Sequence, residues 1–195
     1  NTTEKVLGHG LTSLAHLRLG RPELALASAD LILADLVGRR PVAYWIQHIY
    51  AGLAEVYLSL WRAALCSGDP AWQARTLDLH HKARRTCATL RTFGSIFPFG
   101  KPAALLWTGV YHGVKGNDAK ARRTLTRAVA ESRHLKMRYE EGLARRELGG
   151  LLQVGDAERQ RHLEQACAVL EDIEARHDLE LARELLAQDG SVTGP

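Results

Sequence analysis

The sequence predicts an all-α fold, in which about four antiparallel helical hairpins form a tetratricopeptide-like array, an α-solenoid. Two observations support this fold class. Ala, Leu, Arg and Glu, which favour helices, dominate the composition, while strand-favouring Val, Ile, Thr and aromatic residues are sparse. Apolar residues also recur at helical spacing in paired segments, and short turns separate these segments.

Nine helices are expected. In chain order they cover residues 11–19, 22–36, 41–66, 71–91, 102–114, 118–134, 137–152, 157–173 and 179–187. They group into hairpins over residues 10–38, 41–92, 102–135 and 136–188, with an N-terminal extension over 1–9 and a tail over 189–195. We expect these to form one helical-repeat domain over residues 1–195.

Turn and cap residues set these boundaries. Gly20 ends one helix, and Pro22 suits the first turn of the next. The sequence SGDP at residues 67–70 forms the turn of the second hairpin. In the third hairpin Gly116 lies in the turn, and Asn117 or Asp118 caps the helix that follows.

The segment 135–152 carries apolar residues on two opposite sides of a helix. At about 100° per residue, one side holds Leu135, Tyr139, Gly142 and Leu143, and the other holds Met137, Ala144, Leu148 and Leu151. A helix of this kind is predicted to lie between two neighbours, as in a solenoid. Glu140 and Glu141 point about 100° apart, so we expect surface charge there and no acid/base pair.

Charge and cysteine content bound the class of protein. The 26 basic residues, 20 of them Arg, exceed the 22 acidic ones by a net charge of +4 spread along the chain, which argues only weakly for acidic partners. The three cysteines stand far apart without a C-x-x-C motif, which favours the cytoplasm. Residues 42–61 are apolar but include Gln47, His48 and Glu55, so we expect a buried helix and no membrane span.

Two hairpins share the same small residues at the same places. Ala25 follows Gly20 by five residues, and Ala121 follows Gly116 by five. In the third hairpin, tetratricopeptide spacing, with its period of about 34 residues, is met by Gly109, Gly116, Ala121, Leu125 and Ala128. The second hairpin is longer and departs from that period.

Three short motifs in the second half carry a family resemblance. They are Met-x-Tyr-Glu-x-x-Leu-Ala at residues 137–144, Glu-Leu-Gly at 147–149, and a closing run at 161–166 that includes an added His162. In these motifs the chain resembles the tetratricopeptide-like C-terminal region of bacterial class III adenylate/guanylate cyclases linked to an AAA-type ATPase, and of related multidomain signalling regulators. The resemblance covers residues 102–186 well and 10–91 in outline. It implies a sensor or scaffold role without catalytic residues, within a larger protein.

Motifs for catalysis, cofactors and metals are not found in the sequence. It contains neither a G-x-x-x-x-G-K-[ST] phosphate loop nor a G-x-S-x-G motif. Of the nine histidines, only His81 approaches a cysteine, Cys87, at a spacing near that of a metal site. We therefore expect no enzyme activity, no cofactor and no metal.

The candidate binding residues come from one aromatic segment and from two helices. All three phenylalanines lie in residues 92–101, which we expect to be a loop that either plugs a concave face or docks a partner. The candidate contacts are Phe97, Phe99, Trp107, His112, Arg138 and Arg145. A basic stripe at Lys120, Arg123 and Arg127 is interpreted as a solvated face, because no stacking aromatics accompany it.

The function expected from these observations is non-catalytic. The chain is predicted to be a protein-interaction or regulatory module that contacts a protein or peptide partner, or other domains of the same polypeptide. One alternative is a domain that senses a small-molecule effector, which an enclosed pocket around Trp107 and Tyr111 would favour. A second is a nucleic-acid-binding repeat, against which the dispersed charge argues. Oligomerisation is left open.

Overall fold

The computed structural model describes residues 2–36 and 44–190, and in these the chain forms ten α-helices, two 3-10 helices and no strand. The α-helices are α1 (Thr2–Arg18), α2 (Pro22–Leu36), α3 (Gln47–Cys66), α4 (Pro70–Gln73), α5 (Thr76–Ile96), α6 (Lys101–Val114), α7 (Asp118–His134), α8 (Arg138–Leu151), α9 (Ala157–Asp172) and α10 (Arg176–Gly190), and the 3-10 helices are η1 (Tyr44–Ile46) and η2 (Pro98–Gly100). The all-α prediction is confirmed.

Two predicted boundaries were wrong. Helix α1 begins at Thr2 and not at residue 11, so most of the segment 1–9, which was expected to be an extension, is part of this helix. A Cβ on Gly10 would come within 2.7 Å of the Ile49 side chain, so this glycine allows α1 and α3 to approach closely. Residues 92–101 are not a loop, since α5 continues to Ile96 and η2 leads directly into α6. The predicted helix start at residue 41 lies outside the described residues.

Backbone contacts divide the chain into two compact units, Asn1–Trp107 and Thr108–Pro195, with the boundary inside α6. The prediction of one continuous array over residues 1–195 therefore stays a prediction, and each unit is described by itself.

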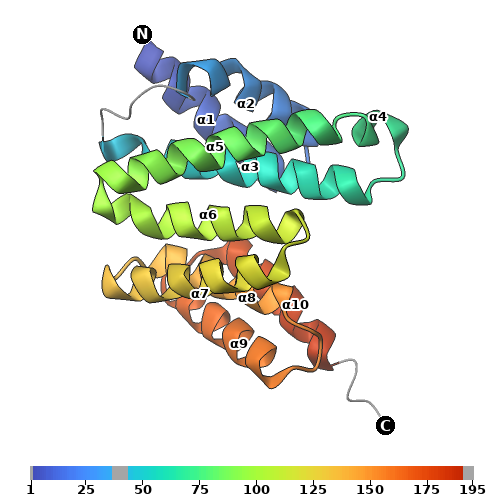
Figure 1. Cartoon of the computed structure of the whole chain (residues 1–195), viewed down its shortest axis with the longest axis vertical. Helices are drawn as coiled ribbons and strands as arrows, with labels where there is room; N and C mark the ends of the chain where they lie inside the picture. Colours follow the sequence, from blue (N-terminus) through green and yellow to red (C-terminus); the bar gives the residue numbers. More distant parts are fainter. Residues whose placement is uncertain (1, 37–43, 191–195) are drawn as a thin grey trace. The chain divides into compact units, whose positions relative to one another are not determined.

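The first unit is built on α1, α2, α3 and α5. Helix α1 packs on α2 and α3, and α3 lies alongside α5 (Figure 1). Its core includes the fully buried side chains of Tyr57 and Phe93. The Asp30 carboxylate in α2 accepts hydrogen bonds from the Tyr57 hydroxyl in α3 and the Lys82 ammonium in α5, each at 2.9 Å. A single carboxylate thus joins three helices of this unit.

In the second unit, α8 packs against both α7 and α9, and α10 packs against α9 (Figure 1). Leu143 and Leu148, predicted on opposite sides of the helix, are 2% and 1% exposed. The two-sided burial of this helix is therefore confirmed. Its Gly142 and Gly149 face α9, where an added Cβ would meet leucine side chains at 2.7 Å.

The turns between helices repeat one backbone geometry. Gly20 and Gly116 have φ of 67° and 78°, and the residue after each donates its N–H to a carbonyl five residues earlier, at 2.9 Å. Lys136 and Glu174 adopt the same left-handed conformation, with φ of 55° and 56°. The four turns thus share one backbone design, and only the first two have glycine, the residue that tolerates a positive φ without strain.

The second helix of three hairpins buries residues at the same i, i+4, i+7, i+11 spacing. These buried positions are Ala25, Ala29, Ile32 and Leu36 in α2, Ala121, Leu125, Ala128 and Ser132 in α7, and Arg159, Leu163, Ala166 and Leu170 in α9. Because the spacing is shared, corresponding outward-facing positions can be compared between these helices.

None of the described helices combines the length and apolarity that crossing a membrane requires.

Candidate functional site

A groove of about 570 Å³ opens on the second unit where α7, α8 and α9 meet. Its apolar lining consists of Val129, Ala130, Leu148, Ala168 and Val169, and its polar and charged lining of Thr126, Arg133, Glu141, Arg145, Arg161, His162 and Gln165. Outward positions of α7 and α9 thus form its walls, and α8 contributes the residues between them. All of these residues belong to one compact unit.

Arg145 is held rigidly in this groove. Its Nε and Nη2 lie 3.0 and 2.9 Å from Glu141 Oε1 on the preceding turn of α8, and its Nη1 donates to the Gln165 side chain of α9. The side chains of Arg145 and Glu141 are only 9% and 12% exposed. The expectation of an exposed charge strip was therefore wrong here, because α7 and α9 cover both flanks of α8.

The groove carries an excess of positive charge. Three guanidinium groups (Arg133, Arg145 and Arg161) face one carboxylate (Glu141), which leaves an excess of two positive charges. The Arg133 side chain is 68% exposed, and its Nε lies 4.0 Å from Glu141 Oε1, which is the limit of an ion pair. Guanidinium groups bind carboxylates with two parallel hydrogen bonds, so this arrangement suits an acidic ligand that also has apolar groups.

His162 lies at the edge of the groove in its neutral form. Burial lowers its pKa, and the nearby Arg145 and Arg161 lower it further, while Glu158 opposes them. Its Nε2 is 3.8 Å from Glu158 Oε1, and its Nδ1 is buried without a hydrogen-bond partner among the described residues. A neutral imidazole here adds no further positive charge at pH 7.

The structure brings only one of the predicted binding residues, Arg145, into this groove. Arg138 instead lies at the start of α8, where its half-exposed side chain forms an ion pair with Asp172 of α9 at 3.0 Å. This contact joins the start of α8 to the end of α9. His112 borders a second, smaller notch of about 510 Å³ around the turn at Gly116.

Trp107, Phe97 and Phe99 belong to the first unit. The Trp107 side chain is 4% exposed. Phe93 is fully buried, and its ring centroid lies 4.9 Å from that of Phe97 and 5.8 Å from that of Phe99. The latter two side chains are half-buried, so the three rings form one cluster at the junction of α5, η2 and α6. Gly100 permits it, because a Cβ there would lie 2.4 Å from the Phe93 ring.

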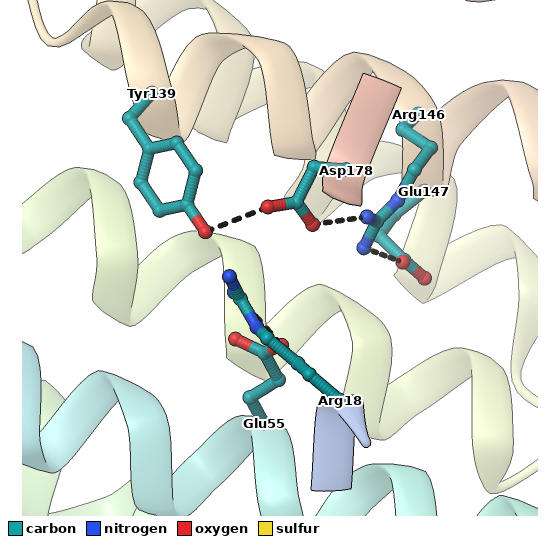
Figure 2. A network of polar contacts seen from close by, with 6 residues as sticks. All are labelled: Arg18, Glu55, Tyr139, Arg146, Glu147 and Asp178. Carbon is teal, nitrogen blue, oxygen red and sulfur yellow. Dashed lines mark hydrogen bonds and ion pairs between the residues drawn. The ribbon is translucent and has the colours of Figure 1, made fainter. Parts of the chain in front are cut away.

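A buried ionic network in α8 and α10 was missed in the sequence (Figure 2). Asp178 accepts hydrogen bonds from the Tyr139 hydroxyl at 2.9 Å and from Arg146 Nη1 at 2.6 Å, and Arg146 Nη2 donates to Glu147 at 2.9 Å. Burial alone would lower the pKa of Arg146, but Glu147 and Asp178 outweigh it and raise that pKa. The network fastens α10 to α8. Figure 2 also draws the Arg18–Glu55 pair (3.3 Å), which joins α1 and α3 in the first unit.

A second buried arginine was also missed. Arg159 of α9 is 2% exposed and donates to the main-chain carbonyls of Gly149 and Leu185, at 3.0 and 2.8 Å. These carbonyls lie near the C-terminal ends of α8 and α10, where the helix dipole favours a cation. Arg159 occupies the position of Ala25 in α2 and Ala121 in α7, so the shared spacing signals its burial.

Residues 2–36 and 44–190 show neither a metal-binding cluster nor an activated cysteine. No group of three or more His, Cys, Asp or Glu residues there is placed to hold a metal ion. Burial raises the pKa of Cys87 to about 12, so its thiol is protonated at pH 7.

Comparison with known proteins places no constraint on function, since no family model, curated protein or solved structure matches this chain.

Proposed function

We propose that the chain is a non-catalytic, tetratricopeptide-like interaction module of a larger bacterial signalling protein in the cytoplasm. In this proposal it binds a polypeptide partner, or another domain of the same polypeptide, in the α7–α8–α9 groove. The observation that carries the proposal is the pairing of an apolar lining with three arginines, one of them fixed by Glu141 and Gln165.

The character of the groove favours a peptide with acidic and apolar side chains. Apolar residues such as Val129 and Val169 offer contact area, and Arg133 and Arg161 extend from its two walls as accessible donors. Because Arg145 is already ordered, less conformational entropy is lost when it binds a carboxylate. A bound segment is thus expected to place an acidic side chain near Arg145 and apolar ones along α7 and α9.

The alternatives differ in testable ways. A small effector would need only part of the groove, and neither this groove nor the notch at His112 is lined by Trp107 or Tyr111. Nucleic acid would instead bind the exposed stripe at Lys120, Arg123 and Arg127. These residues do not line the groove, so substitutions that reverse their charge leave the groove residues unchanged.

The test is selection from a displayed library of random twelve-residue peptides, using the wild-type chain as bait. We expect enrichment of peptides that combine Asp or Glu with Leu, Ile or Phe. The double variant Arg133→Glu, Arg161→Glu should lose at least tenfold in affinity for these peptides, because two attractive contacts become repulsive.

The matched control is the double variant Arg123→Glu, Arg127→Glu. It has the same net charge, and its changed positions are exposed on α7 but do not line the groove. We expect it to bind the selected peptides within about threefold of wild type, since exposed charges are screened over about 10 Å at 0.1 M salt. Equal losses in the two variants, or selected peptides without acidic residues, would contradict the proposal.

A further inference from the structure

Helix α2 carries an apolar stripe on its outer face. Leu24 and Leu31 are 49% and 53% exposed, and Ala27 and Ala34 lie exposed between and after them. The spacing of three, four and three residues is that of the a and d positions of a coiled-coil seam. The opposite face of α2 holds the buried residues of the first unit, so this helix is apolar on both faces.

Helix α2 differs at these outward positions from α7 and α9, the second helices of two other hairpins. Relative to the shared buried positions, the corresponding outward residues are Lys120, Arg123, Arg127 and Ala130 in α7, and Glu158, Arg161, Gln165 and Ala168 in α9. Three of the four positions are charged or polar in α7 and α9, whereas all four are apolar in α2. Contact with water and the lining of the groove account for the stripes of α7 and α9, but neither gives a reason for two half-exposed leucines in α2.

We infer that α2 is the self-association face of this chain, and that a second copy packs its own α2 against it in antiparallel orientation. The order of large and small residues makes the stripe self-complementary about a two-fold axis that crosses it midway between Ala27 and Leu31. In that register Leu24 faces Ala34 of the partner subunit, and Leu31 faces Ala27 of the partner subunit. Every leucine then meets an alanine, so the two helices approach closely and no pair of leucines collides.

The charges beside the stripe define how this dimer responds to salt. Glu23 and Asp30 are both exposed on one flank of α2, and two copies would bring these acidic flanks together. The Lys82 ammonium, 2.9 Å from Asp30, offsets part of this repulsion, but it is shared with Asp78 at 2.8 Å. The association is therefore driven by apolar burial and opposed by charge, so added salt strengthens it.

The size of the face sets the expected affinity. Four apolar side chains from each copy make an interface at or below about 1,200 Å², which is the range of transient complexes. We expect a dissociation constant on the order of 10 µM or larger, because the free energy gained from so small an interface only slightly exceeds the entropy lost on association.

Sedimentation velocity over a wide range of protein concentration tests the inference. The wild-type chain should shift from monomer to dimer, with a stronger shift at 0.5 M NaCl than at 0.05 M, on the order of a few-fold in dissociation constant. Leu31→Glu should be monomeric throughout. The control Leu65→Glu, at a leucine of α3 that is 51% exposed, should dimerise like wild type. Circular dichroism confirms folding of both variants.

Crosslinking tests the register itself. In a Cys66→Ala background, Ala27→Cys with Leu31→Cys places two thiols of one copy opposite two of the other, and mild oxidation should yield a covalent dimer. The pair Leu24→Cys with Leu31→Cys faces alanines in this register and should crosslink at least fivefold less. A chain that stays monomeric at the highest concentration, dimers unaffected by Leu31→Glu, or equal crosslinking of both pairs would overturn the inference.

Discussion

Replacing Asp178 with Asn should destabilise the second unit strongly. The Asp178 and Arg146 side chains are 3% and 8% exposed, and the change leaves Arg146 buried without one of its two carboxylates. Removing one partner of a buried ion pair costs about 3–5 kcal/mol. The Arg146–Glu147 contact at 2.9 Å survives, so we expect a loss of about 3 kcal/mol, at the lower end of that range.

Urea denaturation followed by far-UV circular dichroism measures this loss. With a slope of about 2 kcal/mol per molar urea, the midpoint of the transition that reports the second unit should fall by about 1.5 M. Tyr139→Phe is the matched control, because it removes only the hydroxyl that donates to Asp178 and should cost about 1 kcal/mol. A loss below 1 kcal/mol for Asp178→Asn, or no difference from Tyr139→Phe, would refute the view that this network holds α10 against α8.

Three further predictions concern the second unit. Gly109→Ala should cost about 1–3 kcal/mol in urea melts, because its Cβ would meet Leu125 at 2.6 Å, whereas Gly113→Ala, with 3.7 Å of room, should be neutral or stabilising. Lys136→Gly and Glu174→Gly should each raise thermal stability by about 0.5–1 kcal/mol by removing left-handed strain, and a loss would contradict this. Folding keeps His162 neutral, so the unfolded state binds more protons below pH 6.5 and stability falls there. His162→Gln should flatten the decrease in urea midpoint between pH 7.5 and 5.5, and an unchanged decrease would refute this.

Local signals were sufficient to predict much of the second unit. Helix α7 was expected at residues 118–134 with Asn117 as a possible cap, and the Asn117 side chain accepts a hydrogen bond from the Lys120 N–H. The two apolar sides of residues 135–152 likewise predicted that α8 lies between neighbours. Both inferences use residues close in sequence, where helical periodicity determines which side chains share a face.

The remaining features depend on contacts between residues far apart in sequence. Gly10 was expected only as the start of the first hairpin, but its role in packing depends on Ile49, 39 residues further along the chain. Arg145 and Arg146 look alike in the sequence, yet one lines the groove and the other is buried against Asp178 of α10. A one-residue step turns a side chain by about 100°, so the neighbouring helix decides its environment. The groove was missed for this reason, since three helices contribute to it.

The most direct test of the account is amide hydrogen exchange of the chain with and without a selected acidic peptide. The account predicts slower exchange in α7, α8 and α9 and unchanged exchange at residues 92–101, because the groove and not the phenylalanine cluster holds the ligand. Protection centred on residues 92–101, or no protection of α7 and α9 at saturating peptide, would contradict it.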